Sequence, residues 1–444
     1  MKNDYLITEN PLKALIVFAI PMIIGNLFQQ AYTMADSAIV GRLVGEKALA
    51  AVGAAYSLTN IFICVAIGGG MGASVIVSQY FGHGNYGKLK KTVYTALVTF
   101  LVISVMLGVI GLVFSKNIMI AMNTPVEVLD MSVTYLQIYF LGLPFLFMYN
   151  VLSSMFNALG KSRIPLYFLI FSSVFNIVLD WVFVADFALD VAGVAWATLI
   201  AQGVSVLGSF TVLRKELKKL EGASDGIFEA EELLPMAKIA LPSILQQSTV
   251  SIGMMLVQSV VNSFGAESLA GFSAGMRIES ICIVPMAAVG NAISSYTAQN
   301  IGAGQLKRVS KGYVQANKMV IFFGVVICVI LELFPTQLIT LFLGADGSQV
   351  AIATGYGYLV FMGFFFFMIG FKMAADGVLR GAGDMTLFTI ANLVNLSIRV
   401  IMAMTLAPRF GIAWVWYAVP IGWTANFVIS YLEYRTGKWK TIRR

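Results

Sequence analysis

Charged residues are scarce in this sequence. Only 11% of its 444 residues are Asp, Glu, Lys or Arg, whereas 59% are hydrophobic and the mean hydropathy is +0.84. Because soluble domains carry about 25% charged residues, this composition excludes a soluble globular protein.

Cysteine and histidine are rarer still. The three cysteines, Cys64, Cys282 and Cys328, lie within apolar runs, so we expect small buried hydrophobic residues rather than a disulfide-rich scaffold. The single histidine, His83, cannot alone supply a histidine-based metal site or a histidine-dependent catalytic triad. With no Walker motif and no visible nucleophile and base set, we predict a protein that is not an enzyme and uses no cofactor.

Long apolar stretches dominate the chain instead. A membrane-spanning helix needs roughly 20 mostly apolar residues, and the sequence contains twelve such stretches. Because none shows the ~10-residue alternation of an outer-membrane barrel, we predict an all-α integral membrane protein. The predicted spans cover residues 12–39, 49–80, 92–115, 132–157, 165–186, 190–213, 237–264, 268–300, 314–334, 352–376, 386–407 and 412–434.

Basic residues predict the orientation, because cytoplasmic loops of membrane proteins are enriched in Lys and Arg. With both termini placed in the cytoplasm, 22 of the 29 basic residues lie inside. The net charge of +7 is then spread over cytoplasmic loops, which favours a multi-pass protein of a prokaryotic cytoplasmic membrane over a nucleic-acid binder. The other basic residues are Arg42, Lys47, Lys116 and Arg409 outside, and Arg277, Lys372 and Arg399 at membrane depth.

The two halves of the chain repeat. A polar linker, residues 214–236, separates a six-span lobe at 1–213 from a six-span lobe at 237–444. At an offset of 220 residues, GEKALA at 45–50 matches GAESLA at 265–270. Since each half has an even number of spans, we predict two parallel six-helix lobes related by a pseudo-twofold axis along the membrane normal. A ligand site is expected at their interface.

Carboxylates at membrane depth are the strongest functional candidates, since burying such a group costs at least ~2.5–3.5 kcal/mol. Asp36 lies late in the first span and Asp180 in the fifth, and Asn176 shares a helix face with Asp180 four residues away. Thr198, in the sixth span, lies at a height comparable to that of Asp180. Two desolvated carboxylates with an amide and a hydroxyl would bind one proton, or would ligate a hard cation such as Na⁺.

Two other features of the first half concern the backbone. Pro21 removes one hydrogen bond from the first span, so we expect bending that could couple ionisation of Asp36 to the shape of the cavity. The run Gly68-Gly69-Gly70-Met71-Gly72 lacks the neighbours of a nucleotide loop and predicts close helix packing or bending instead.

The second half carries a different set of charges. Lys372 and Asp376 are four residues apart in span ten and can pair. Arg277 and Glu279 lie in span eight, and Arg399 lies near the repeat position of Asp180. These five residues either pair structurally or shape the charge of a cavity or of the seal between the lobes.

The sequence resembles the multidrug and toxic compound extrusion (MATE) family of secondary transporters. The resemblance rests on Pro21 with Asp36, the loop QYFGHGN at 79–85, NALG at 157–160, NIVLD at 176–180 and LRGAGD at 379–384. It is strongest to the DNA-damage-inducible branch. It implies a V-shaped pair of lobes and cation-coupled drug antiport, with a cation site formed by Asp36, Asn176, Asp180 and Thr198 together with Tyr32.

We therefore expect an antiporter, driven by H⁺ or Na⁺, that exports small organic and often cationic drugs by alternating access. The expected surroundings are the lipid bilayer, with no nucleic-acid partner, and the expected oligomeric state is a monomer. A lipid-linked-precursor flippase of the same superfamily is the alternative, although such proteins usually carry extra spans and a cationic cavity. A channel is a further alternative, which the twofold repeat and the paired buried acids disfavour.

Overall fold

The computed structural model describes residues 4–187, 189–222, 226, 228–344 and 347–441, and these residues form helices and connecting loops without any strand. The predicted all-α fold is therefore confirmed. Lys2, Arg443 and Arg444, three of the basic residues assigned to the cytoplasmic side, lie outside the described residues.

All twelve predicted spans fall on helices. Ten helices are long and apolar enough to cross a membrane, and the pair α12 (Gln349–Gly363) and α13 (Phe366–Ala382), bent by 53°, makes an eleventh if counted as one span. The twelfth predicted span is α15 (Ala413–Thr436), a 24-residue helix. It stays below the hydropathy threshold of the others because it contains three Trp and three Tyr, whose ring polar groups lower the average.

The helices divide into two compact units, which we name by their residues: the 24–244 unit, and the unit formed by 1–23 with 245–444. The boundary crosses α2 (Pro11–Ile39) and α8 (Leu233–Asn262), in each case two residues beyond a proline, Pro21 or Pro242. These units differ from the division predicted from the repeat at both ends, and the lobe limits 1–213 and 237–444 stay a prediction.

Specific contacts explain the assignment of the exchanged segments. The Lys90 ammonium donates to the Leu220 carbonyl at 2.9 Å, and the Tyr80 hydroxyl donates to Glu232 at 2.8 Å, which ties the polar linker to the 24–244 unit. At the other end of the chain, Arg308 donates to the Glu9 carbonyl at 2.7 Å and Asn300 to the Leu6 carbonyl at 3.0 Å. The N-terminal residues therefore pack with the second half of the sequence.

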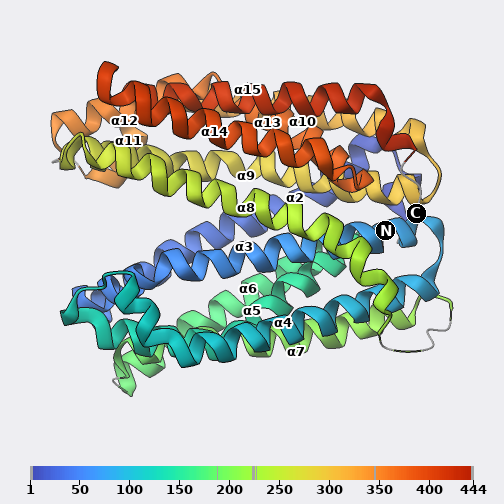
Figure 1. Cartoon of the computed structure of the whole chain (residues 1–444), viewed down its shortest axis with the longest axis horizontal. Helices are drawn as coiled ribbons and strands as arrows, with labels where there is room; N and C mark the ends of the chain where they lie inside the picture. Colours follow the sequence, from blue (N-terminus) through green and yellow to red (C-terminus); the bar gives the residue numbers. More distant parts are fainter. Residues whose placement is uncertain (1–3, 188, 223–225, 227, 345–346, 442–444) are drawn as a thin grey trace. The chain divides into compact units, whose positions relative to one another are not determined.

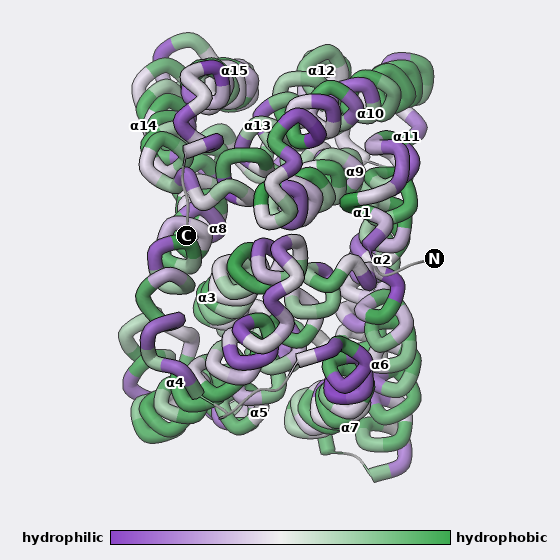
Figure 2. The backbone as a smooth tube through the Cα atoms, turned by 90° about the vertical axis from the view of Figure 1, so that its right-hand side faces the viewer, coloured by the Kyte–Doolittle hydropathy of each residue, from purple (hydrophilic) through white to green (hydrophobic). Residues whose placement is uncertain are grey.

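The 24–244 unit is a bundle of long helices that run side by side (Figures 1 and 2). Glycines allow the close approach of α3 to α8: a Cβ on Gly68 would lie 2.5 Å from the Ile244 backbone, and one on Gly72 would lie 2.5 Å from the Ala240 backbone. The close packing predicted for the glycine run is thus confirmed. Besides its parts of α2 and α8, the unit contains η1 (Val40–Val44), α3 (Glu46–His83), α4 (Tyr86–Ala121), α5 (Val126–Ala158), α6 (Arg163–Trp181), η2 (Val182–Asp186), α7 (Asp190–Lys218) and η3 (Ala230–Glu232).

The other unit is a second helical bundle, and both chain ends lie at the same end of it (Figure 1). Its core gathers large buried side chains such as Phe18, Tyr296, Phe366 and Trp439. Besides α12, α13 and α15 and its parts of α2 and α8, it contains α1 (Tyr5–Thr8), α9 (Ala266–Gly302), α10 (Leu306–Leu333), α11 (Pro335–Leu343), α14 (Met385–Phe410) and η4 (Lys438–Lys440).

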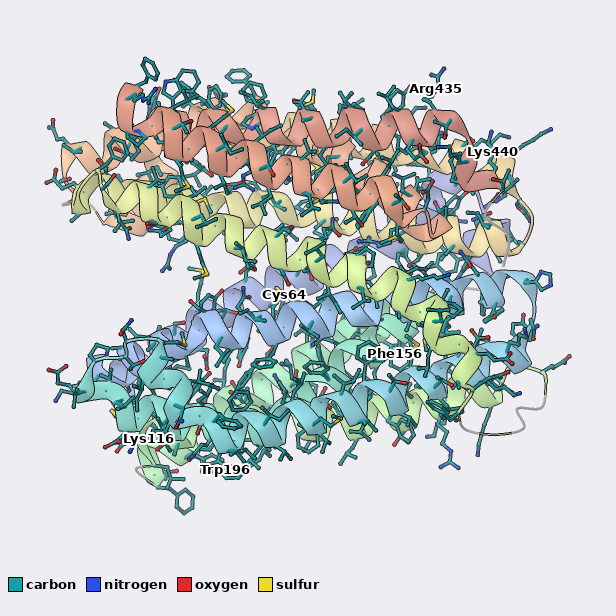
Figure 3. The ribbon with its side chains drawn as sticks, in the orientation of Figure 1. Cys64, Lys116, Phe156, Trp196, Arg435 and Lys440 are labelled. Carbon is teal, nitrogen blue, oxygen red and sulfur yellow. The ribbon has the colours of Figure 1, made fainter. Side chains whose placement is uncertain are left out.

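The outward faces of the helices are apolar. Exposed aliphatic and aromatic side chains line them, among them Val113 on α4 at 69% and Phe322 on α10 at 64%, and apolar colouring follows most of each long helix (Figure 2). Lys116 and Trp196 lie near the same end of the 24–244 unit (Figure 3), as expected for residues at a membrane–water interface. Such faces suit contact with lipid.

Candidate functional site

Five polar side chains of the 24–244 unit converge from three helices. Tyr32 and Asp36 are four residues apart on α2, Asn176 and Asp180 are four apart on α6, and Thr198 comes from α7. The i, i+4 spacing places both members of each pair on one helix face. The structure thus brings together all five residues that the sequence predicts for the cation site.

Asn176 is the centre of the cluster. Its side-chain amide lies 2.5 Å from the Tyr32 hydroxyl. In the orientation that satisfies its neighbours, the amide donates to Asp180 Oδ2 at 3.0 Å and accepts from the Thr198 N–H at 3.0 Å. This one side chain therefore links α2, α6 and α7.

The two carboxyl groups meet beside this amide. Asp36 and Asp180 approach within hydrogen-bonding range of each other, although Asp180 is fully buried. One oxygen of each carboxyl group, Oδ1, is buried without a hydrogen-bond partner. Among the residues that the structure describes, no Lys or Arg forms an ion pair with either. A cluster of oxygen atoms with excess negative charge is suited to binding a proton or a small hard cation.

A small polar cavity of about 60 Å³ adjoins the cluster. It is large enough for water, and its lining joins the candidate site to further polar groups deeper in the bundle. Those that can hydrogen-bond are Gln29, Tyr32, Tyr149, Ser172, Ser173, Asn176, Thr198 and Gln202. An ion or a proton could thus reach the carboxylates through a hydrated path inside this unit.

Two π-helical segments flank the site, and the sequence gave no sign of them. Segment η1 follows the helix that carries Asp36, η2 follows the helix that carries Asp180, and the two segments contact each other. The widened turn of a π-helix is frequent at functional sites. The carboxylates therefore lie just before the points at which both helices leave regular α geometry.

Tyr135 on α5 is a site residue that sequence reasoning missed. It lies within electrostatic range of both Asp36 and Asp180. Its signal was a polar aromatic residue in the fourth span, which cannot be distinguished from interfacial or packing tyrosines in the sequence alone.

In the other unit, Lys372 and Asp376 form a buried ion pair of 3.3 Å on α13. Asp376 also accepts hydrogen bonds from Ser430 at 2.6 Å and from Asn392 at 3.3 Å. Nearby, the buried Arg380 donates to Asn291 at 2.8 Å. The pair predicted from the i, i+4 spacing is present, and its partners on α14 and α15 could not be seen in the sequence.

The remaining predicted charges separate. Arg277 is exposed, whereas Glu279, two residues further along α9, is buried and accepts a hydrogen bond from the Tyr358 hydroxyl. Arg399 on α14 lies within electrostatic range of Glu279. The structure therefore resolves the five predicted charges into two buried groups and one exposed arginine.

Comparison with known proteins identifies relatives across the whole chain. The MatE family model matches twice, over residues 21–182 and 242–405, and both matches begin at a proline, Pro21 or Pro242. A "Probable multidrug resistance protein YpnP" of Bacillus subtilis is 31% identical, and the alignment covers 98% of this chain and 97% of the relative. An "FAD transporter" of Shewanella oneidensis is 24% identical, with 77% of each chain covered.

Solved structures show the same fold. A crystal structure of a "MATE in complex with MaL6" superimposes with a TM-score of 0.91 at 24% identity, covering 99% of this chain and 100% of the other. The sequence match extends over most of both halves, and the structural match extends over all of the chain. The protein is thus a multi-pass helical membrane protein that belongs to the MatE family.

Proposed function

We propose that this protein is a cation-coupled antiporter that exports organic, often cationic, drugs across a prokaryotic cytoplasmic membrane. Its family consists of transporters rather than enzymes, and relatives are named multidrug resistance and multidrug export proteins. The observation that carries the coupling is the pair Asp36 and Asp180, two adjoining carboxyl groups with unpartnered oxygens and no basic partner in the described residues.

The chemistry of the pair explains how coupling would work. When both carboxylates are ionised, they repel each other in a poorly solvated site, so binding of H⁺ or Na⁺ there is favourable. Asn176 would hold the Asp180 carboxylate in place, while the Thr198 and Tyr32 oxygens could complete the ligands of a Na⁺ ion. Binding removes the repulsion between α2 and α6, which changes the energy of the helix that carries Pro21.

The ionic driving force is adequate for this role. One charge that moves through 100 mV supplies about 2.3 kcal/mol, which corresponds to a roughly 50-fold concentration ratio of exported drug. In the proposed cycle, cation binding from outside displaces the drug, and the cation-loaded protein then turns inward and releases the cation. We place both termini in the cytoplasm and expect a monomer to suffice, because the cation site lies within one unit.

Transport by the purified protein in liposomes tests this proposal. A fluorescent organic cation is loaded, and a pH gradient or a Na⁺ gradient is imposed in separate experiments. Export driven by one gradient supports an antiporter and identifies its ion. If neither gradient drives export while a lipid-linked precursor is moved, the flippase alternative replaces the drug antiporter; a flavin nucleotide is a third substrate to include, because one relative is an FAD transporter.

A further inference from the structure

The second half of the chain contains a counterpart of the candidate cation site. Asn395 and Arg399 follow Asn176 and Asp180 by 219 residues, so the motif Asn-x-x-x-Asp on α6 becomes Asn-x-x-x-Arg on α14. The loops that follow agree, since Gly193-Val194-Ala195-Trp196 reappears as Gly411-Ile412-Ala413-Trp414. This agreement fixes the register: Arg399 is the repeat equivalent of Asp180.

Two other positions of the site are also repeated. Tyr135 and Tyr358, each followed by leucine, are equivalent at an offset of 223 residues, and Thr59 and Glu279 are equivalent at 220. The contacts repeat as well. Tyr135 lies within range of Asp180, and its equivalent Tyr358 lies within range of Arg399 and donates a hydrogen bond to Glu279.

The charges of the two sites are opposite in origin. In the first repeat, Asp36 and Asp180 carry two negative charges and lack a basic partner. In the second repeat, the position of Asp36 falls on Leu256 or Val257, and the one carboxylate is that of Glu279. The guanidinium of Arg399 cannot lose its proton in a protein, so this counterpart is neutral without any bound ion.

The surroundings of Arg399 resemble an ion site rather than a contact ion pair. Arg399 and Glu279 interact electrostatically but do not come within 4.0 Å of each other. The Arg399 Nε and the Oδ1 of Asn395 are both buried without a hydrogen-bond partner. Helix α15 closes over them, because a Cβ on Gly422 would lie 2.4 Å from Asn395 Oδ1 and 3.0 Å from Arg399 Cγ.

We propose that Arg399 is a tethered cation that occupies, in the second repeat, the role that a free coupling ion has in the first. This inference rests on the proposed function for its meaning in transport: only the Asp36–Asp180 site exchanges ions, and Glu279 is permanently neutralised by the chain. Evolution of the repeat would thus have replaced a mobile cation by a covalently held one, whose local concentration is always high.

Chemical rescue tests the role of Arg399 without any transport assay. Arg399→Ala leaves Glu279 buried without its counter-charge, so the melting temperature of the purified protein should fall. Millimolar guanidinium ion should bind in the vacated space and raise the melting temperature of this variant in a saturable manner, whereas it should only lower that of the wild type. The double variant Arg399→Ala/Glu279→Gln should show no such rise.

Arg277→Ala is the matched control, because Arg277 is an exposed arginine on α9 two residues from Glu279. It should melt like the wild type and gain no response to guanidinium. Two results would overturn the proposal: a folded Arg399→Ala variant that guanidinium does not stabilise, or a stabilisation that persists in the double variant.

The neutral pair Glu279→Gln/Arg399→Gln covers the case in which Arg399→Ala does not fold. It removes both charges together, so it should fold and should transport with the same number of ions per drug molecule as the wild type. A folded neutral pair with altered ion stoichiometry would contradict the tethered cation. If no ion gradient drives transport by the wild type, the proposed function fails, while the guanidinium response still decides the role of Arg399.

Discussion

The side-chain amide of Asn176 lies 2.5 Å from the hydroxyl of Tyr32 and so joins α6 to α2 at the level of Asp36 and Asp180. Every polar group of the candidate site is reached from this amide directly or through one neighbour. The predictions below follow from this arrangement and from the charge pairs of the other unit.

Replacing either carboxylate should uncouple transport. In Asp36→Asn and in Asp180→Asn, the repulsion that makes ion binding favourable is gone, so ion-driven export in liposomes should fall to the level of empty vesicles. Ser37→Ala is the control, because the exposed Ser37 hydroxyl bonds only to the Thr33 carbonyl of its own helix. Full coupled export by Asp180→Asn would remove this residue from the mechanism.

Removing the hydroxyl of Tyr32 should have a smaller effect. Tyr32→Phe keeps the ring but loses one hydrogen bond, which is worth about 1 kcal/mol, so the coupling ion should bind about fivefold more weakly. The ion concentration that gives half-maximal export measures this change. An unaltered value would show that the Tyr32 oxygen takes no part in the site.

The buried pair Lys372–Asp376 should be more important for stability than for coupling. Lys372→Met leaves Asp376 buried without its counter-charge, and breaking such a pair costs about 3–5 kcal/mol. The double variant Lys372→Met/Asp376→Asn should recover most of this loss, because no unpaired charge remains. Unfolding in detergent measures both variants, and a double variant less stable than Lys372→Met would contradict the explanation.

The close contact of α3 with α8 predicts a matched pair of glycine variants. Gly72→Ala places a Cβ 2.5 Å from the Ala240 backbone, and such overpacking costs about 1–3 kcal/mol. Gly53→Ala on the same helix meets nothing within 4 Å and should be neutral or stabilising. Equal melting temperatures for the two variants would show that α3 and α8 are not in contact.

Asp384, in the loop between α13 and α14, predicts a pH-dependent stability. Burial and the neighbouring Glu433 raise its pKa from 3.8 to about 6, against the opposing effect of Lys438. Because the folded state favours the protonated form, this contribution to stability is complete below pH 4 and is lost as the pH rises through 6. The melting temperature should therefore decline over this range.

Asp384→Asn should remove that decline and should melt higher than the wild type at pH 7. Glu267→Gln, which changes an exposed acid at the start of α9, is the control and should keep the wild-type pH profile. An Asp384→Asn variant with an unchanged profile would assign the pH dependence to another group.

Hydropathy and helical spacing were sufficient to predict much of this molecule. Runs of apolar residues located the spans, and the spacing of four residues located the pairs Asn176–Asp180 and Lys372–Asp376, because both signals are local. The partners Tyr135, Asn392 and Ser430 come from other helices, and no local pattern reports which helices meet. Likewise, the sequence could not show that the polar linker packs through Lys90 and Tyr80, which shifts the boundary of the compact unit.

The repeat register of Arg399 marks the limit of the sequence argument. From the membrane charges alone, its equivalence to Asp180 was uncertain by about one helical turn. The matching loops after α6 and α14, together with the contacts of Tyr135 and Tyr358, settle it because four separate positions agree.

The most direct test of the central claim is a count of coupling ions bound by the purified protein. Proton release or Na⁺ binding is measured at equilibrium for the wild type, for Asp36→Asn/Asp180→Asn and for Glu279→Gln/Arg399→Gln. The account predicts one ion that the first double variant loses and the second retains. Retention of the ion by Asp36→Asn/Asp180→Asn would contradict a coupling site at these carboxylates.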